Sequence, residues 1–145
     1  MPAALLLKGL VMVTVPISAK RRISLRIARG LVAFAFILFG MLKLIGVPMM
    51  VTVFDHVGLG QWFRYVTGAI EVGGAILLLS PRFVGAAATL LGFTMVGAII
   101  SHFTVVPGSP VPATILLTLC VVIAWSYRST TLALLGQAPA QRVAA

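Results

Sequence analysis

Four long apolar runs separated by short breaks dominate the pattern of the chain. They cover residues 30–47, 62–79 (or 65–79), 83–103 and 111–127. At a rise of about 1.5 Å per residue these runs extend roughly 24 to 32 Å, close to the thickness of a hydrocarbon core. The apolar–polar alternation that the strands of a membrane barrel require does not occur. The pattern therefore predicts an all-α protein in which four helices cross a membrane.

The breaks between these runs predict how the helices are connected. Pro81 and Arg82 separate the second run from the third, and the segment TVVPGSP (104–110) separates the third from the fourth. Such short links place consecutive helices antiparallel, so we expect an up-down four-helix bundle. The connection over 49–61 is the longest and least regular, and it mixes apolar residues with Asp55 and His56. We expect it to be a membrane-surface loop that covers the outer end of the bundle.

The composition supports a membrane location and excludes other classes of protein. Of the 145 residues, 61% are hydrophobic and 9% are charged, whereas a soluble domain carries about 25% charged residues. A soluble enzyme, a disordered tail and a nucleic-acid binder are therefore excluded, despite a net charge of +9. The partner that the composition indicates is the lipid bilayer, and the composition does not indicate an oligomeric state.

The basic residues predict the orientation of the bundle. Six of the eleven precede the first apolar run, and Arg82, Arg128 and Arg142 fall on the same predicted side, against Arg64 alone on the other side. Because basic residues accumulate on the cytoplasmic side, we expect a multi-pass protein of the inner (plasma) membrane with both termini in the cytoplasm.

The same pattern predicts the organisation of the chain. We expect a basic cytoplasmic segment over 1–29, a four-helix transmembrane domain over 30–128 and a short cytoplasmic tail over 129–145. The apolar stretch over 1–17 precedes the basic cluster KRR, and this order is the reverse of that in a cleaved signal. We expect this stretch to be disordered or to lie in the membrane interface.

Three ionisable residues inside the apolar runs mark a candidate site. Lys43, Glu71 and His102 fall toward the predicted outer side. Asp55 and His56 of the middle connection, and Arg64, cap the same side. An ionisable side chain at the centre of a bilayer costs roughly 2.5 to 3.5 kcal/mol, so it normally faces the bundle interior and finds a partner. Lys43 and Glu71 lie at similar depth on neighbouring antiparallel runs. We therefore expect these two side chains to pair, and His102 to point into the same interior.

The candidate site has three interpretations that the residues leave open. Lys43 and Glu71 can form a buried ion pair that fixes the register of two helices. Alternatively, the site is functional: Glu71 can accept a proton, or Lys43 and His102 can donate hydrogen bonds to a quinone-like carbonyl. The ligand would bind in a pocket between the first three helices, roofed by residues 54–56. A metal site needs His56 to fold inward, and no HxxxH or ExxH spacing supports one, so we assign no metal ligand.

The single cysteine limits the redox chemistry open to the chain. Cys120 stands alone, which excludes an internal disulfide and a CxxC redox pair. Its neighbours Leu119 and Val121 are apolar, so we expect it to be a packing residue. The chain also has no haem-attachment motif, no nucleotide-binding loop and no catalytic triad.

Two short motifs give the chain a family resemblance. The string GMLKL at 40–44 and the string GAIEVGGAILLL at 68–79 resemble the DoxX and DoxX-like small membrane proteins. The resemblance implies a four-helix bundle of the inner membrane, with Lys43 and Glu71 at the charged motif positions and His102 fitting the end of the third span. Some members of that family are named as subunits of a thiosulfate to quinone oxidoreductase, others are associated with redox-stress complexes, and a distant vertebrate relative is an assembly chaperone for nicotinic receptors.

Two functional hypotheses follow from the residues and the resemblance. In the first, the chain is a subunit of a membrane redox complex that binds a quinone or another lipophilic ligand, while a partner protein supplies any other cofactor. In the second, it is a non-enzymatic protein that scaffolds or assists assembly of a membrane complex. The sequence alone leaves open whether the chain is an enzyme.

Overall fold

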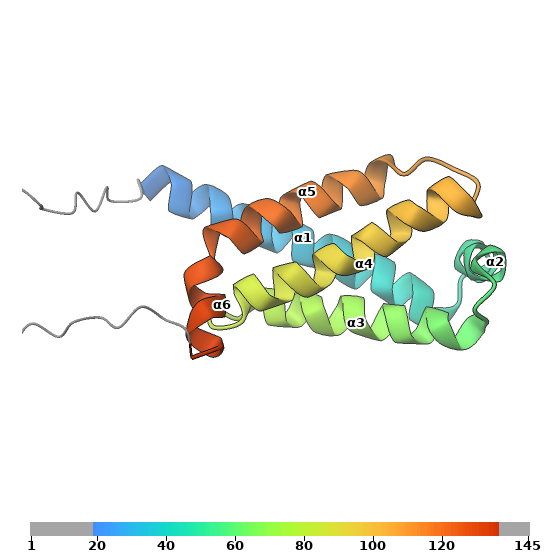
Figure 1. Cartoon of the computed structure of the whole chain (residues 1–145), viewed down its shortest axis with the longest axis horizontal. Helices are drawn as coiled ribbons and strands as arrows, with labels where there is room; N and C mark the ends of the chain where they lie inside the picture. Colours follow the sequence, from blue (N-terminus) through green and yellow to red (C-terminus); the bar gives the residue numbers. More distant parts are fainter. Residues whose placement is uncertain (1–18, 137–145) are drawn as a thin grey trace, which may run out of the picture.

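The computed structural model describes residues 19–136, which fold into helices without a strand among them (Figure 1). The six helices are α1 (Ala19–Ile45), α2 (Pro48–Val57), α3 (Gln61–Leu79), α4 (Val84–Thr104), α5 (Val111–Ser126) and α6 (Arg128–Leu134). The described residues do not include residues 1–17, for which a disordered or interfacial segment is expected, or the last part of the predicted tail.

The long helices have the length and the apolar character of membrane spans. Within the described part of the chain, α1, α3 and α4 each qualify as a span, and α5 with α6 forms a fourth if the pair, bent by 66°, is counted as one. Their bounds agree with the predicted runs to within one or two residues, except at the start of α1. The prediction of an all-α membrane bundle is therefore confirmed.

The helix α1 begins eleven residues before the apolar run that predicted it. The expected start at residue 30 was placed where the charged residues end. However, the stretch 19–29 has no Gly or Pro to interrupt a helix, and its basic residues are good helix formers. Arg29 ties this turn to the bundle, because its Nη2 donates a hydrogen bond to the Leu79 carbonyl at 2.7 Å and its guanidinium lies 5.5 Å from the centre of the Tyr127 ring. The separate cytoplasmic segment over 1–29 stays a prediction.

The prediction of an irregular loop between the first two spans is wrong, because residues 48–57 form the helix α2. Pro48 occupies its first turn, where the ring fixes a helical φ and the missing N–H has no partner to lose. Gly58 ends the helix with a φ of 76°, a left-handed conformation that favours glycine. Met50 and Phe54, four residues apart, are both buried on its inner side. These signals define an amphipathic helix lying across the bundle end.

The four long helices pack as two pairs around one core. α1 packs mainly against α3 and α4 mainly against α5, while α3 also contacts α4. Glycines allow the close contacts: a Cβ on Gly40 would stand 3.0 Å from the Gly68 carbonyl oxygen, and one on Gly74 would stand 2.7 Å from Leu91. The largest fully buried side chains between the pairs are Phe36, Leu78, Leu91, Ile123, Val32, Val84 and Cys120.

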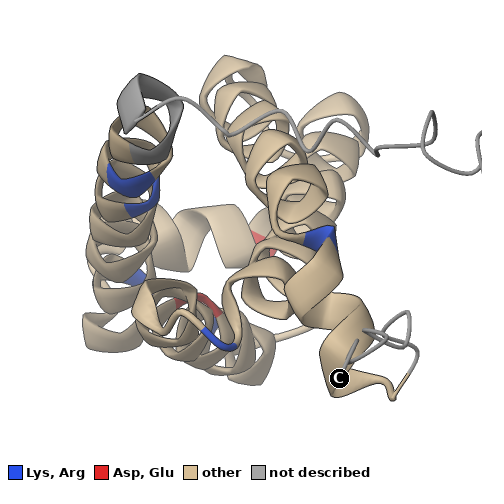
Figure 2. Cartoon of the chain, turned by 90° about the vertical axis from the view of Figure 1, so that its left-hand side faces the viewer, with Lys and Arg blue, Asp and Glu red and all other residues tan. Residues whose placement is uncertain are grey.

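The two ends of the bundle differ in charge. We call them the α2 end and the α6 end after the short helix at each (Figure 1). Viewed from the α6 end, several basic positions lie toward the viewer, whereas the two acidic positions lie farther back (Figure 2). The helix α6 folds onto the start of α4, where a Cβ on Gly85 would stand 2.7 Å from the Tyr127 carbonyl oxygen. Because the two acidic residues lie away from α6, the candidate site belongs to the half of the bundle toward α2.

Candidate functional site

Lys43 and Glu71 form an ion pair between α1 and α3, as the sequence predicts. The Lys43 Nζ donates to the Glu71 Oε2 at 2.6 Å, and the two side chains are 14% and 3% exposed. Side chains on a helix lean toward its N-terminus. Because α1 and α3 are antiparallel, Lys43 leans toward the α6 end and Glu71 toward the α2 end, so the two lean toward each other. The close Gly40–Gly68 contact brings the backbones near enough for this bond.

Arg64 is the second buried cation of the site; its position in the sequence predicts the outer side, where the site lies, but not its burial. Its side chain is only 4% exposed, although it was assigned to the outer surface as the one basic residue there. Its Nη1 donates to the carbonyl oxygen of Lys43, at the C-terminal turn of α1. The Lys43 carbonyl also accepts the Gly46 N–H at 3.2 Å, so Arg64 supplies a second donor there, and its charge complements the helix dipole. Arg64 therefore caps α1 and supports the backbone of the lysine that pairs with Glu71.

Gln61 connects Arg64 to α2. The Arg64 Nε donates to the Gln61 Oε1 at 2.7 Å, and the Gln61 Nε2 donates to the Asp55 Oδ1 at 2.6 Å and to the Val51 carbonyl at 3.0 Å. The result is one hydrogen-bonded chain from α2 through α3 to α1. We call it the polar network; its members are Asp55, Gln61, Arg64, Lys43 and Glu71.

The two histidines of the candidate site lie apart from this network. The His56 Nδ1 lies 2.7 Å from the Thr52 carbonyl on its own helix, and the side chain is exposed. His102 is half-buried in the last turn of α4, and its Nδ1 has no hydrogen-bond partner among the described residues. No hydrogen bond found between described residues joins either histidine to Lys43 or Glu71. The structure thus brings together Asp55, Lys43 and Glu71, but does not connect the histidines to them.

The inward direction of Arg64 and Gln61, which was not predicted, is indicated by their spacing in the sequence. Arg64, Gly68 and Glu71 are spaced by four and three residues, so they lie on one face of α3. The small-residue face that places Glu71 against α1 therefore also places Arg64 there. Gln61 continues the same face three residues earlier, at the first turn of α3. If residues 48–57 are read as a helix, Asp55 is expected beside Gln61.

An open groove lies elsewhere in the molecule. It has a volume of about 420 Å³ and lies between α4 and α5, and none of the five candidate residues lines it. Cys120 lies beneath it and is fully buried, in agreement with its predicted packing role. Within residues 19–136, no three His, Cys, Asp or Glu side chains are placed to hold a metal ion. The pocket expected between the first three helices stays a prediction.

Comparison with known proteins gives one match. Residues 27–126, more than two thirds of the chain, match the model of the DoxX-like family. Searches of curated proteins and of solved structures give no match.

Proposed function

The chain belongs to the DoxX-like family, and we propose that it is a multi-pass membrane subunit that scaffolds or assists assembly of a membrane complex. The observation that carries this proposal is the closed polar network. Lys43, Gln61, Arg64 and Glu71 each have a partner within the chain, so the network joins three helices without a ligand.

The closed ion pair favours a structural role for Lys43 and Glu71 over a ligand site. A charge-assisted hydrogen bond of 2.6 Å between buried groups is among the strongest that side chains make. A neutral quinone carbonyl would have to compete with the Glu71 carboxylate for the lysine. Behind the pair, Gly40 and Gly68 are packed so closely that neither leaves room for a ligand between the backbones. The site therefore has the features of a rigid helix–helix contact between α1 and α3.

A second function is supported by polar groups that the network leaves free. The Lys43 ammonium has three N–H donors, of which the described contacts use one. The buried Nδ1 of His102 has no partner among the described residues. Two such groups are what a quinone-class carbonyl or hydroxyl would engage. The alternative proposal is therefore a subunit that binds a quinone or a similar lipophilic molecule for a redox partner.

The quinone content of the purified protein separates the two proposals. The wild-type chain is extracted from membranes in mild detergent, and its absorption spectrum and solvent-extractable quinone are measured against the Lys43→Met/Glu71→Leu variant. Under the scaffold proposal, quinone stays far below one per chain in both proteins, and both migrate in the same high-mass complex on a native gel. About one quinone per wild-type chain, lost from the double variant, would instead establish the ligand-binding function. A wild-type chain that lacks quinone and also migrates alone would contradict both proposals.

A further inference from the structure

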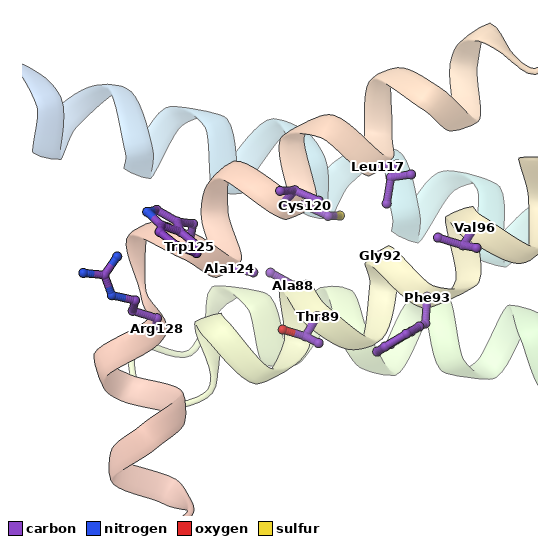
Figure 3. Close-up of a pocket in the computed structure, with 11 residues that line it drawn as sticks. Ala88, Thr89, Gly92, Phe93, Val96, Leu117, Cys120, Ala124, Trp125 and Arg128 are labelled. Atoms are coloured by element: carbon purple, nitrogen blue, oxygen red, sulfur yellow. The ribbon is translucent and has the colours of Figure 1, made fainter. Parts of the chain in front are cut away.

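The groove between α4 and α5 is an apolar channel on the side of the bundle, in the half toward α6 (Figure 3). Its floor is made of small residues, which is why the two helices leave space between them. A Cβ on Gly92 would meet only ordinary contacts, at 3.7 Å from Leu117 and 3.8 Å from Cys120. The residues that bound the groove most directly are Ala88, Gly92, Phe93, Leu117, Ala124 and Trp125.

A cation stands at the mouth of this groove. Arg128 lines it and is exposed, and its guanidinium lies 4.8 Å from the centre of the Trp125 ring. Trp125 is itself 69% exposed. Tryptophan is enriched at the level of lipid headgroups, where its ring is half in hydrocarbon and half in water. The mouth of the groove therefore has the character of the membrane interface, and its interior that of the hydrocarbon core.

The charge of Arg128 has no carboxylate partner among the residues that the structure describes. The sequence contains two acidic residues, and both of them, Asp55 and Glu71, belong to the polar network toward the opposite end of the bundle. Arg82 is also exposed at the α6 end, where it lines a second hollow with Thr130. Within residues 19–136, this end of the bundle therefore offers no carboxylate that could neutralise Arg82 and Arg128.

We propose that the groove binds an anionic phospholipid, with one acyl chain along α4 and α5 and the phosphate on the Arg128 guanidinium. The planar guanidinium offers paired N–H donors that match phosphate oxygens. The apolar walls offer van der Waals contacts to the methylenes of an acyl chain without burying a polar group. Basic sites between membrane helices are a known mode of recognition of anionic headgroups. This inference is independent of the scaffold proposal, because it concerns other helices and other residues.

Lipid binding to the purified full-length chain tests this proposal. Native mass spectrometry compares phosphatidylglycerol with phosphatidylcholine of identical acyl chains. We expect tighter binding of phosphatidylglycerol, and Arg128→Gln should weaken it by about fivefold, the factor that corresponds to about 1 kcal/mol for one basic side chain at an anionic surface. The matched control is Arg26→Gln, which removes the same charge from an exposed position on α1 away from the groove and should leave binding unchanged.

A second pair of variants tests the acyl-chain groove. Gly92→Leu fills the groove and should weaken binding of both lipids, whereas Gly97→Leu adds the same side chain to α4 where a Cβ meets nothing within 4 Å and should have no effect. Thr89→Leu, from an exposed position that lines the groove, repeats the test without altering buried packing. The proposal is overturned if Arg128→Gln and Arg26→Gln weaken binding equally, if the two lipids bind alike, or if filling the groove has no effect.

Discussion

At the scale of single residues, the buried charges carry most of the specificity of the fold. The chain has two acidic residues, and both are engaged by neighbouring side chains in one network. Glu71 is 3% exposed and depends on Lys43 for its compensation. The consequence is that either member of the pair is costly to remove alone, while removing both is tolerated better.

A double-mutant cycle on the ion pair is the first prediction. Glu71→Leu leaves the Lys43 ammonium buried and unpaired, so it should lower the free energy of unfolding by about 3 kcal/mol. Lys43→Met should lower it by a similar amount, and the double variant should recover most of the loss. Thermal unfolding in a fixed detergent measures all four proteins. A double variant whose loss equals the sum of the two single losses would show that the residues are not coupled.

The second prediction concerns the geometry of Arg64 and not only its charge. Arg64→Lys keeps the cation but cannot donate to both the Lys43 carbonyl and Gln61 from one rigid group. We expect a loss of stability of about 1 to 3 kcal/mol, the cost of buried polar groups left unpaired. Arg82→Lys is the matched control, because Arg82 is exposed at the other end of the bundle; it should be neutral. Equal melting temperatures for the two variants would contradict the capping role.

The sequence predicts the ion pair but only part of the network. Lys43 and Glu71 stand out because each is a charge within an apolar run, where a partner is required. Arg64 sits at the end of a run, where charges usually face water, so sequence position alone assigned it to the surface. Its spacing with Gly68 and Glu71 indicates the inward face, but its contact with the Lys43 carbonyl at the end of α1 is a tertiary feature. The distance from the His102 ring to Lys43 and Glu71 depends in the same way on how α4 packs. No spacing in the sequence predicts this distance.

At the scale of helices, glycine contacts set the distances between α1, α3 and α4. Gly40 and Gly68 face each other across the first pair, and Gly74 receives Leu91 from α4. Small residues let membrane helices approach closely, where van der Waals packing rather than the hydrophobic effect holds them. The positions of the charged groups follow from these contacts.

The third prediction tests the role of the glycine contacts with two substitutions on α1. Gly40→Ala places a methyl group 2.8 Å from Val72 and 3.0 Å from the Gly68 carbonyl oxygen, so it should push α1 from α3 and destabilise the protein by about 1 to 3 kcal/mol. Gly30→Ala lies on the same helix with nothing within 4 Å of the new atom. It should be neutral or slightly stabilising, because alanine favours a helix. Destabilisation by Gly30→Ala alone would contradict the packing argument.

The ends of the helices were harder to predict than their centres. Hydrophobic runs mark the part of a helix that lipid surrounds, but a helix continues beyond that part wherever nothing interrupts it, as α1 does from Ala19. The helix α2 was missed because its ten residues are too few for a span and its polar residues resemble a loop. Pro48 and Gly58 were the signals that could have defined it.

At the scale of the whole molecule, the asymmetry of charge predicts which way the bundle faces. The folded chain buries Arg64 and most of Lys43, whereas Arg82 and Arg128 are exposed at the α6 end. The basic residues of the described chain that face outward near α6 therefore match the expected cytoplasmic side.

The fourth prediction is this orientation. In a Cys120→Ala background, Ser109→Cys lies in the exposed loop between α4 and α5, and Ser129→Cys is exposed on α6. An impermeant thiol reagent added to intact cells should label position 109 only, and position 129 should react only after the membrane is opened. Labelling of position 129 in intact cells would reverse the assignment.

The bend between α5 and α6 has a consequence for the surrounding bilayer. α5 has 16 residues before the chain turns by 66°, which gives a length of about 24 Å, shorter than a hydrocarbon core of about 30 Å. α1, with 27 residues, is long enough to cross with a tilt. Local thinning of the lipid beside α5 is one way in which a bilayer accommodates such a mismatch, and we predict it here. The protein should therefore be more stable in vesicles of shorter acyl chains, and two copies should attract each other through the thinned annulus that their α5 flanks share.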